Sequence, residues 1–128
     1  MPIEGVVYDY READHEDRRR AIVTAFNGDL GDFVARQVKI ALIKEEATLG
    51  GHYHEYDELY YLLEGKGSFT LKEIATGLIE KYEMAKGNRL YIPRRVAHKA
   101  VLKPGSILIG CTGQPYASAI QNDYGFEF

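Results

Sequence analysis

Hydrophobic and polar residues alternate over short runs along the chain, and turn signals separate the runs at even intervals. The turn signals combine glycine with asparagine, aspartate, lysine or proline, as in Asn27-Gly28-Asp29, Gly65-Lys66-Gly67 and Lys103-Pro104-Gly105. In one run Val38, Ile40 and Leu42 alternate with other residues, which is the period of a strand with two different faces. Short strands spaced by turns predict an all-β sandwich or barrel and not parallel βαβ units.

Eight runs have the length and composition of strands: Ala21–Phe26, Arg36–Lys44, Leu59–Leu63, Ser68–Lys72, Leu78–Tyr82, Arg89–Ile92, Ala97–Leu102 and Ser106–Cys111. The charged stretch from Tyr10 to Arg20 is predicted to be an irregular surface segment. The tail from Gln114 to Phe128 is rich in aromatic residues. We expect it to pack against the core or a neighbouring subunit, because exposed rings would forgo about 1.5–3 kcal/mol of burial each.

Composition and charge narrow the class of protein. A chain of 128 residues with 45% hydrophobic and 27% charged residues is expected to form one globular domain over 1–128. The net charge of −3 argues against a nucleic-acid partner. The longest apolar run, Leu59–Leu63, is far short of the roughly 20 residues that span a bilayer, and no signal peptide is readable. The single Cys111 excludes an internal disulfide and a Cys-rich zinc site. We expect a cytoplasmic protein.

Three of the four histidines fall in a pattern that is suited to chemistry. His52 and His54 are two residues apart, which on a strand places both imidazoles on one face; Glu58 follows four residues later, and His98 comes after a turn-forming segment. An HxH pair alone also fits a solvated or packing role. Three imidazoles with one carboxylate make a mixed N/O set, which suits iron, manganese, nickel, cobalt or zinc. The set would leave up to two positions on an octahedral ion open to a substrate.

The spacing of these residues resembles the two motifs of the cupin superfamily. The first motif has glycine, HxH, three or four residues, glutamate, six residues and glycine, and here it spans 51–65, with Gly51, His52, His54, Glu58 and Gly65. The second has glycine, five residues, proline, one residue, glycine, two residues, histidine, three residues and asparagine. Here it starts at Gly87 and reaches its histidine at 98, with Pro93 and His98 in place, Arg95 where the family has glycine and Leu102 where it has asparagine.

The resemblance implies a jelly-roll barrel, the cupin double-stranded β-helix, with one divalent transition metal inside near one mouth. His52, His54, Glu58 and His98 stand at the positions of the family's metal ligands. The departures at Arg95 and Leu102 do not touch a ligand position, but they bear on the geometry of the turn. Cupins of this size are commonly dimers that exchange or pair N-terminal strands, so a homodimer is expected.

Four further residues are candidates for substrate binding. Tyr60 shares strand parity with Glu58 and is expected to point into the cavity, where the two would serve as the acid–base pair. Alternation along the chain places Arg94 on the side of His98, where it would hold an anionic group; a solvated turn is the alternative. Gln37 and Lys39 project inward or lie on an exposed edge.

Three functions are compatible with these residues. The layout of the first forty-four residues looks like that of small sugar-modifying cupins, which favours an isomerase or epimerase of a sugar, a nucleotide sugar or a similar small polar or anionic molecule. The run from His52 to Gly67 is similar to acireductone dioxygenases, so a metal-dependent dioxygenase is the alternative. A cupin that only binds a small ligand is the third. The sequence by itself does not establish that the protein is an enzyme.

Overall fold

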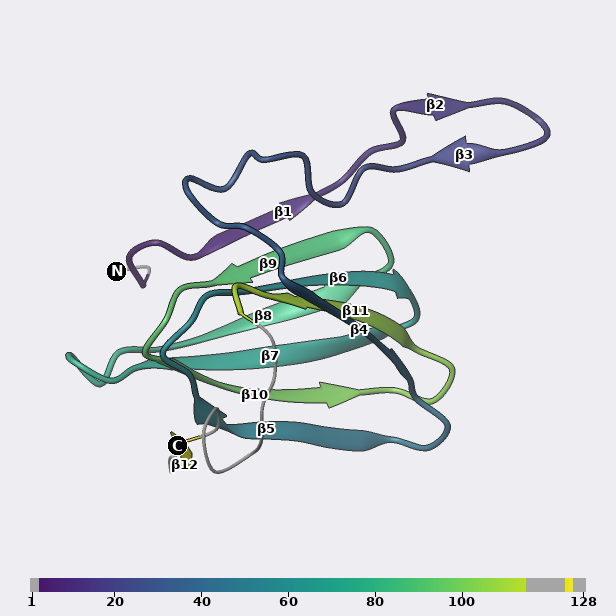
Figure 1. Ribbon diagram of the computed structural model, residues 1–128. Helices are drawn as coiled ribbons and strands as arrows, with labels where there is room; N and C mark the ends of the chain where they lie inside the picture. The colour runs from purple at the N-terminus through teal and green to yellow at the C-terminus, as the bar shows by residue number, and fades with distance from the viewer. Residues whose placement is uncertain (1–2, 115–123, 126–128) are drawn as a thin grey trace.

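The computed structural model describes residues 3–114 and 124–125 of the chain (Figure 1). These residues form strands, turns and loops, and the described part contains no helix and therefore no helix that could cross a membrane. The strands are β1 Val7–Tyr10, β2 His15–Glu16, β3 Ala21–Ile22, β4 Gln37–Leu42, β5 Ala47–Tyr53, β6 Glu58–Glu64, β7 Lys66–Glu73, β8 Ile79–Ala85, β9 Asn88–Ile92, β10 Val96–Leu102, β11 Ile107–Thr112 and β12 Tyr124–Gly125. Most of the aromatic tail predicted to pack lies outside the described residues.

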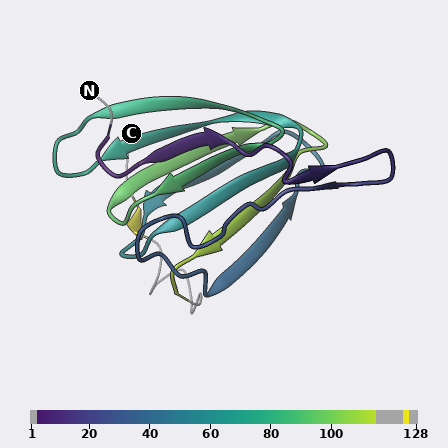
Figure 2. The same cartoon turned by 90° about the horizontal axis from the view of Figure 1, so that it is seen from above.

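Two five-stranded antiparallel sheets face each other and form the body of the molecule. Their strand orders are β1-β9-β6-β11-β4 and β12-β5-β10-β7-β8, so neighbouring strands in each sheet are mostly distant in sequence. The short β2–β3 hairpin stands apart from both sheets and projects beyond them in both views (Figure 1, Figure 2). This crossing order in two packed sheets is that of a jelly roll, which confirms the predicted fold class.

The core between the sheets is filled by every second residue of the central strands. Leu62 in β6 and Leu90 in β9 face Phe69 and Leu71 in β7 and Leu102 in β10, and each of them is at most 1% exposed. Each such side chain contributes roughly 1.5–3 kcal/mol through burial. Leu102 is thus a core residue at the position where the cupin motif has asparagine.

A second, smaller apolar layer covers the outer face of the first sheet. Leu30 and Phe33, from the segment that follows the hairpin, pack on Leu59 of β6, and the ring of Phe33 meets that of Tyr91 edge-on at 5.5 Å. The layer covers β6 and β9 and stops short of β4, whose outward side chains remain 60–63% exposed.

Arg89 in β9 ties the N-terminal segment to this sheet. Its guanidinium is buried and donates hydrogen bonds to Asp9 at 2.9 and 3.1 Å, to Asp29 at 3.1 Å and to the Ala25 carbonyl at 3.0 Å. The predicted strand Ala21–Phe26 is shortened to Ala21–Ile22. After Ile22, the Ala25 carbonyl accepts a hydrogen bond from Arg89 and Phe26 packs in the outer layer, so these residues do not pair in a β-ladder.

Candidate metal centre and cavity

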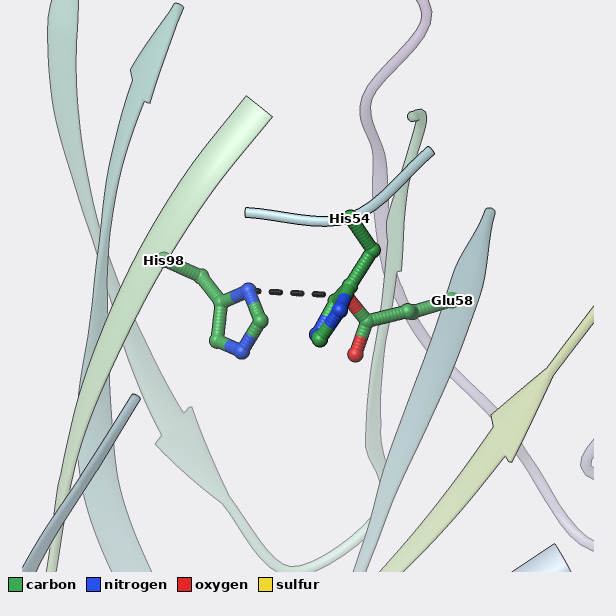
Figure 3. A group of neighbouring side chains, drawn as sticks. All are labelled: His54, Glu58 and His98. Carbon is green, nitrogen blue, oxygen red and sulfur yellow. Dashed lines mark ion pairs between the residues drawn. The ribbon is translucent and has the colours of Figure 1, made fainter. Parts of the chain in front are cut away.

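Three of the four predicted metal ligands come together at one end of the barrel. Glu58 opens β6, His98 lies within β10, and His54 lies in the loop that follows β5. Their side chains point toward one another from these three elements (Figure 3). Glu58 Oε1 lies 3.2 Å from His54 Nε2 and 3.5 Å from His98 Nδ1, and one donor atom of each residue falls within 4.8 Å of the others.

The cluster is shielded from solvent, which distinguishes it from a group of charged side chains on the surface. His54, Glu58 and His98 are only 3–5% exposed. A buried carboxylate beside two imidazoles is stabilised by a shared cation or proton, because an uncompensated buried charge is costly. Two nitrogen donors and one oxygen donor fit the borderline divalent metals. These three donors of the four predicted are therefore compatible with a metal in the folded chain.

The fourth predicted ligand, His52, is placed by its backbone only. His52 pairs with His98 across β5 and β10, and a bulge follows at His98 and Lys99. Its side chain lies outside the described residues, so its role as a ligand stays a prediction. Gly50, with φ of 97°, allows this close approach of the two strands, because a Cβ there would lie 2.5 Å from the His98 carbonyl oxygen.

A cavity of about 320 Å³ adjoins the cluster and holds most of the predicted substrate residues. Gln37 and Lys39 line this cavity from β4, which corresponds to the inward one of the two orientations considered for them. The other lining residues are Ala41, Leu49, His54, Tyr56, Glu58, Tyr60, Leu108, Gly110 and Thr112. The cavity thus combines an apolar wall with an amide, an ammonium and a phenol close to the cluster.

Tyr60 links the cavity to the carboxylate. Its hydroxyl donates a short hydrogen bond to Glu58 Oε2, whereas Oε1 of the same carboxylate faces the two histidines. The phenol ring packs on Phe69 and approaches β11 at Gly110, where a Cβ would lie 3.0 Å from Tyr60 Cε1. A glycine at this point of β11 therefore lets the phenol lie in the cavity.

Tyr56 is a cavity residue that the sequence reasoning did not identify. Its ring stacks on the imidazole of His54, with centroids 4.6 Å apart and planes 12° apart, and Tyr56 is only 6% exposed. The sequence offered one signal, an aromatic residue two positions after the candidate ligand His54. In the structure Tyr56 lies in the loop between β5 and β6. Loops have no fixed side-chain period, so the sequence did not indicate its direction.

Arg94, expected in the cavity beside His98, lies outside it. Its side chain is 62% exposed and its Nε lies 3.3 Å from Asp57 Oδ1, in a separate cleft of about 250 Å³. The expectation assumed strand alternation from Arg94 to His98. Arg94 and Arg95 instead form a turn, in which Arg95 has φ of 65°, so the parity of β10 does not extend to Arg94.

A curated protein matches part of the chain. An uncharacterized protein of Methanocaldococcus jannaschii is 33% identical over 81 residues, which are 61% of this chain and 58% of the relative. The match thus spans little more than half of that protein. No protein-family model matches the sequence.

Solved structures share the fold over most of the chain. The 3'-monoepimerase ChmJ of Streptomyces bikiniensis, in complex with dTDP-quinovose, has a TM-score of 0.80 at 21% identity, over 91% of this chain and 68% of its own. NovW of Streptomyces spheroides, a 4-keto-6-deoxy sugar epimerase, has a TM-score of 0.81 at 14% identity, over 98% and 70%. A mutant of the 3,4-ketoisomerase QdtA of Thermoanaerobacterium thermosaccharolyticum, in complex with TDP-4-keto-6-deoxyglucose, has 0.75 at 15%, over 92% and 86%. The cupin fold expected from the two motifs is confirmed.

Proposed function

We propose that this cupin-fold protein is an isomerase or epimerase of a sugar-type substrate, with nucleotide sugars as the first class to test. The observation that carries the proposal is the buried His54–Glu58–His98 cluster, which adjoins a cavity with an apolar wall and a few polar side chains. Support comes from the fold, which is shared with structures described as nucleotide-sugar epimerases and ketoisomerases. Both reactions move a proton on a carbon beside a carbonyl group.

We propose that His54, Glu58 and His98 hold one divalent metal, with His52 as a fourth ligand. When bound there, a divalent cation would supply a Lewis acid that polarises a substrate carbonyl. The division of the Glu58 carboxylate supports this arrangement, because Oε1 faces the histidines and Oε2 accepts the hydrogen bond of Tyr60.

The chain's own side chains can bind the substrate and move its proton. Tyr60 holds its proton at the phenol oxygen beside Glu58, where the pair can take a proton from a substrate carbon and return it. Lys39 and Gln37 offer an ammonium and an amide to substrate oxygens from the facing strand. Ala41, Leu49 and Leu108 form an apolar wall that excludes water from the reacting atoms.

Exchange of hydrogen for deuterium tests this function. With TDP-4-keto-6-deoxyglucose in deuterated water and without oxygen, the metal-loaded protein is expected to incorporate deuterium next to the carbonyl, measured by mass spectrometry and NMR. Lys39→Met should weaken substrate binding by about tenfold, because it removes a charged hydrogen-bond donor worth about 1.5 kcal/mol. Lys81→Met is the control, since Lys81 is exposed on β8 outside the cavity.

Each alternative function predicts a different result. Oxygen consumption with an oxidised product, and no exchange without oxygen, would favour a dioxygenase. Binding without exchange, under either condition, would favour a protein that only binds its ligand. No binding of the nucleotide sugar by the metal-loaded protein would contradict this substrate class.

We also propose that two copies of the chain pair through β4. This strand forms the edge of its sheet in the described part of the chain, and Val38, Ile40 and Leu42 are 60–63% exposed on its outer face. Proteins normally cover or charge such an apolar edge. A second copy is the partner proposed here, because an antiparallel pair of identical strands is self-complementary about a twofold axis.

Light scattering at micromolar concentration should give the mass of a dimer, and Ile40→Lys should give the mass of a monomer. Ile79→Lys is the matched control, because Ile79 is 51% exposed on β8, an edge strand of the other sheet. A monomeric wild type, or a dimer that Ile40→Lys leaves intact, would contradict pairing through β4.

A further inference from the structure

We propose that Asp57 and Arg94 form a clamp that positions the ligand-bearing loop after β5 against the turn before β10. Arg94 is then a positioning residue and does not bind substrate. The clamp holds His54 and Glu58 in place relative to His98, so the inference rests on the metal centre proposed above. It assigns a role to an ion pair that lies outside the cavity.

The Asp57 carboxylate connects the loop to the end of β9 and the turn after it. Oδ1 accepts hydrogen bonds from the Arg94 backbone N–H at 2.9 Å and from Arg94 Nε at 3.3 Å, and Oδ2 accepts one from the Tyr91 hydroxyl at 2.6 Å. The Asp57 side chain is only 13% exposed. Charge-assisted bonds of a carboxylate that is shielded from water are stronger than those at an open surface.

Backbone bonds continue the connection on both sides of Asp57. The Arg95 N–H donates to the His54 carbonyl at 2.8 Å, and the Gly113 N–H donates to the Asp57 carbonyl at 3.0 Å. Glu58 follows Asp57 directly, and His98 lies three residues after Arg95. A shift of the loop against the turn would therefore change the spacing between His98 and the other two donors.

Tyr91 supplies a donor that stays protonated. Burial, and after it the hydrogen bond to Asp57, raises the pKa of the Tyr91 phenol well above its ordinary value. The phenol therefore donates to Asp57 over the whole range of working pH. Asp57 thus has hydrogen bonds from the Tyr91 hydroxyl and from two groups of Arg94.

Arg95 provides a natural comparison for Arg94. The two side chains are 63% and 62% exposed and each pairs with an acid, Arg95 with Glu55 at 3.6 Å and Arg94 with Asp57 at 3.3 Å. Glu55 is 48% exposed, whereas Asp57 is 13% exposed. Because water screens both members of the Arg95–Glu55 pair, only the Arg94–Asp57 pair is expected to hold the loop.

Cobalt(II) binding to Arg94→Gln and Arg95→Gln tests the clamp. Arg94→Gln should lower the affinity for cobalt by about tenfold and Asp57→Asn by about 10–100-fold, the usual cost of losing a group that orients metal ligands. Both should change the visible absorption spectrum of the bound cobalt, which reports ligand geometry. Arg95→Gln should match the wild type in affinity and spectrum. At saturating cobalt, affinity for dTDP should be the same in Arg94→Gln and the wild type.

Hydrogen exchange of the backbone amides separates this proposal from the metal centre itself. In the metal-free protein, Arg94→Gln should speed exchange in residues 54–58 and at Arg95, and Arg95→Gln should not speed exchange in 54–58. If the wild type binds no cobalt, the metal centre is overturned and the exchange rates alone decide the clamp. Two results would overturn the clamp. One is equal cobalt affinities and exchange rates in Arg94→Gln and Arg95→Gln, and the other is a loss of dTDP affinity in Arg94→Gln at unchanged cobalt affinity.

Discussion

Replacing Glu58 by glutamine is expected to lower the affinity for a divalent metal by roughly 100-fold and to abolish deuterium exchange into the substrate. The carboxylate is the only acidic group in the buried cluster and faces both imidazoles through one oxygen. An amide of the same shape has no charge to offset that of the cation and presents an NH₂ group that cannot act as a ligand. Elemental analysis of untagged protein, supplied in turn with iron, manganese, nickel, cobalt and zinc, measures the occupancy.

Glu55→Gln is the matched control for this prediction. Glu55 lies in the loop that leads to Glu58, but its side chain is 48% exposed and pairs with Arg95 at 3.6 Å. We expect one metal per chain in this variant, as in the wild type. Full occupancy in Glu58→Gln, or no metal in the wild type under any of the supplied ions, would contradict the metal centre.

Replacing Arg89 by methionine is expected to lower the free energy of unfolding by roughly 2–4 kcal/mol, because it removes a buried cation that holds several acceptors. The guanidinium bonds to Asp9, Asp29 and the Ala25 carbonyl, and these contacts hold the N-terminal segment on the outer face of the first sheet. Urea unfolding at neutral pH measures the change. Lys86→Met is the control, since its pair with Glu64 is 68% and 54% exposed and contributes little.

The same contact predicts how stability depends on pH. The hydrogen bond from Arg89 lowers the pKa of the Asp29 carboxyl from 3.8 to about 2. Since the pKa is lower in the folded state, the contribution of this carboxylate is present above about pH 4 and is lost as the pH falls from about 4 to about 2. Arg89→Met should lack this part of the acid dependence. If Arg89→Met lowers the free energy of unfolding at neutral pH by less than about 1 kcal/mol, the role of Arg89 as an anchor is contradicted.

The sequence predicted what depends on local pattern and spacing. The alternation in β4 separated Gln37 and Lys39, which line the cavity, from the exposed Val38, Ile40 and Leu42. Seven of the eight predicted runs are strands with each bound shifted by at most three residues, and the eighth, Ala21–Phe26, is shortened to Ala21–Ile22. The spacing of the two motifs predicted a group of four metal ligands, and the structure brings three of them together as buried donors, His54, Glu58 and His98.

Features that depend on distant partners or on loops were not predictable from the pattern. Strand β1 is stabilised by pairing with β9, and its own sequence, Val-Tyr-Asp-Tyr, lies beside a charged stretch that favours a surface segment. His54 was expected on a strand with His52, but β5 ends at Tyr53. The direction of Arg94 depended on the positive φ of Arg95, a conformation that a side chain other than glycine rarely adopts.

The reach of Arg89 has a consequence for synthesis of the chain on the ribosome. Its partner Asp9 lies 80 residues earlier, so a ribosome that adds about 5–20 residues per second makes Asp9 about 4–16 s before Arg89. Until β9 is made, Leu30 and Phe33 lack the complete surface of β6 and β9 that they cover in the folded protein. We expect the nascent N-terminal segment to be the part of the chain that most needs a chaperone, and the outer layer to dock last.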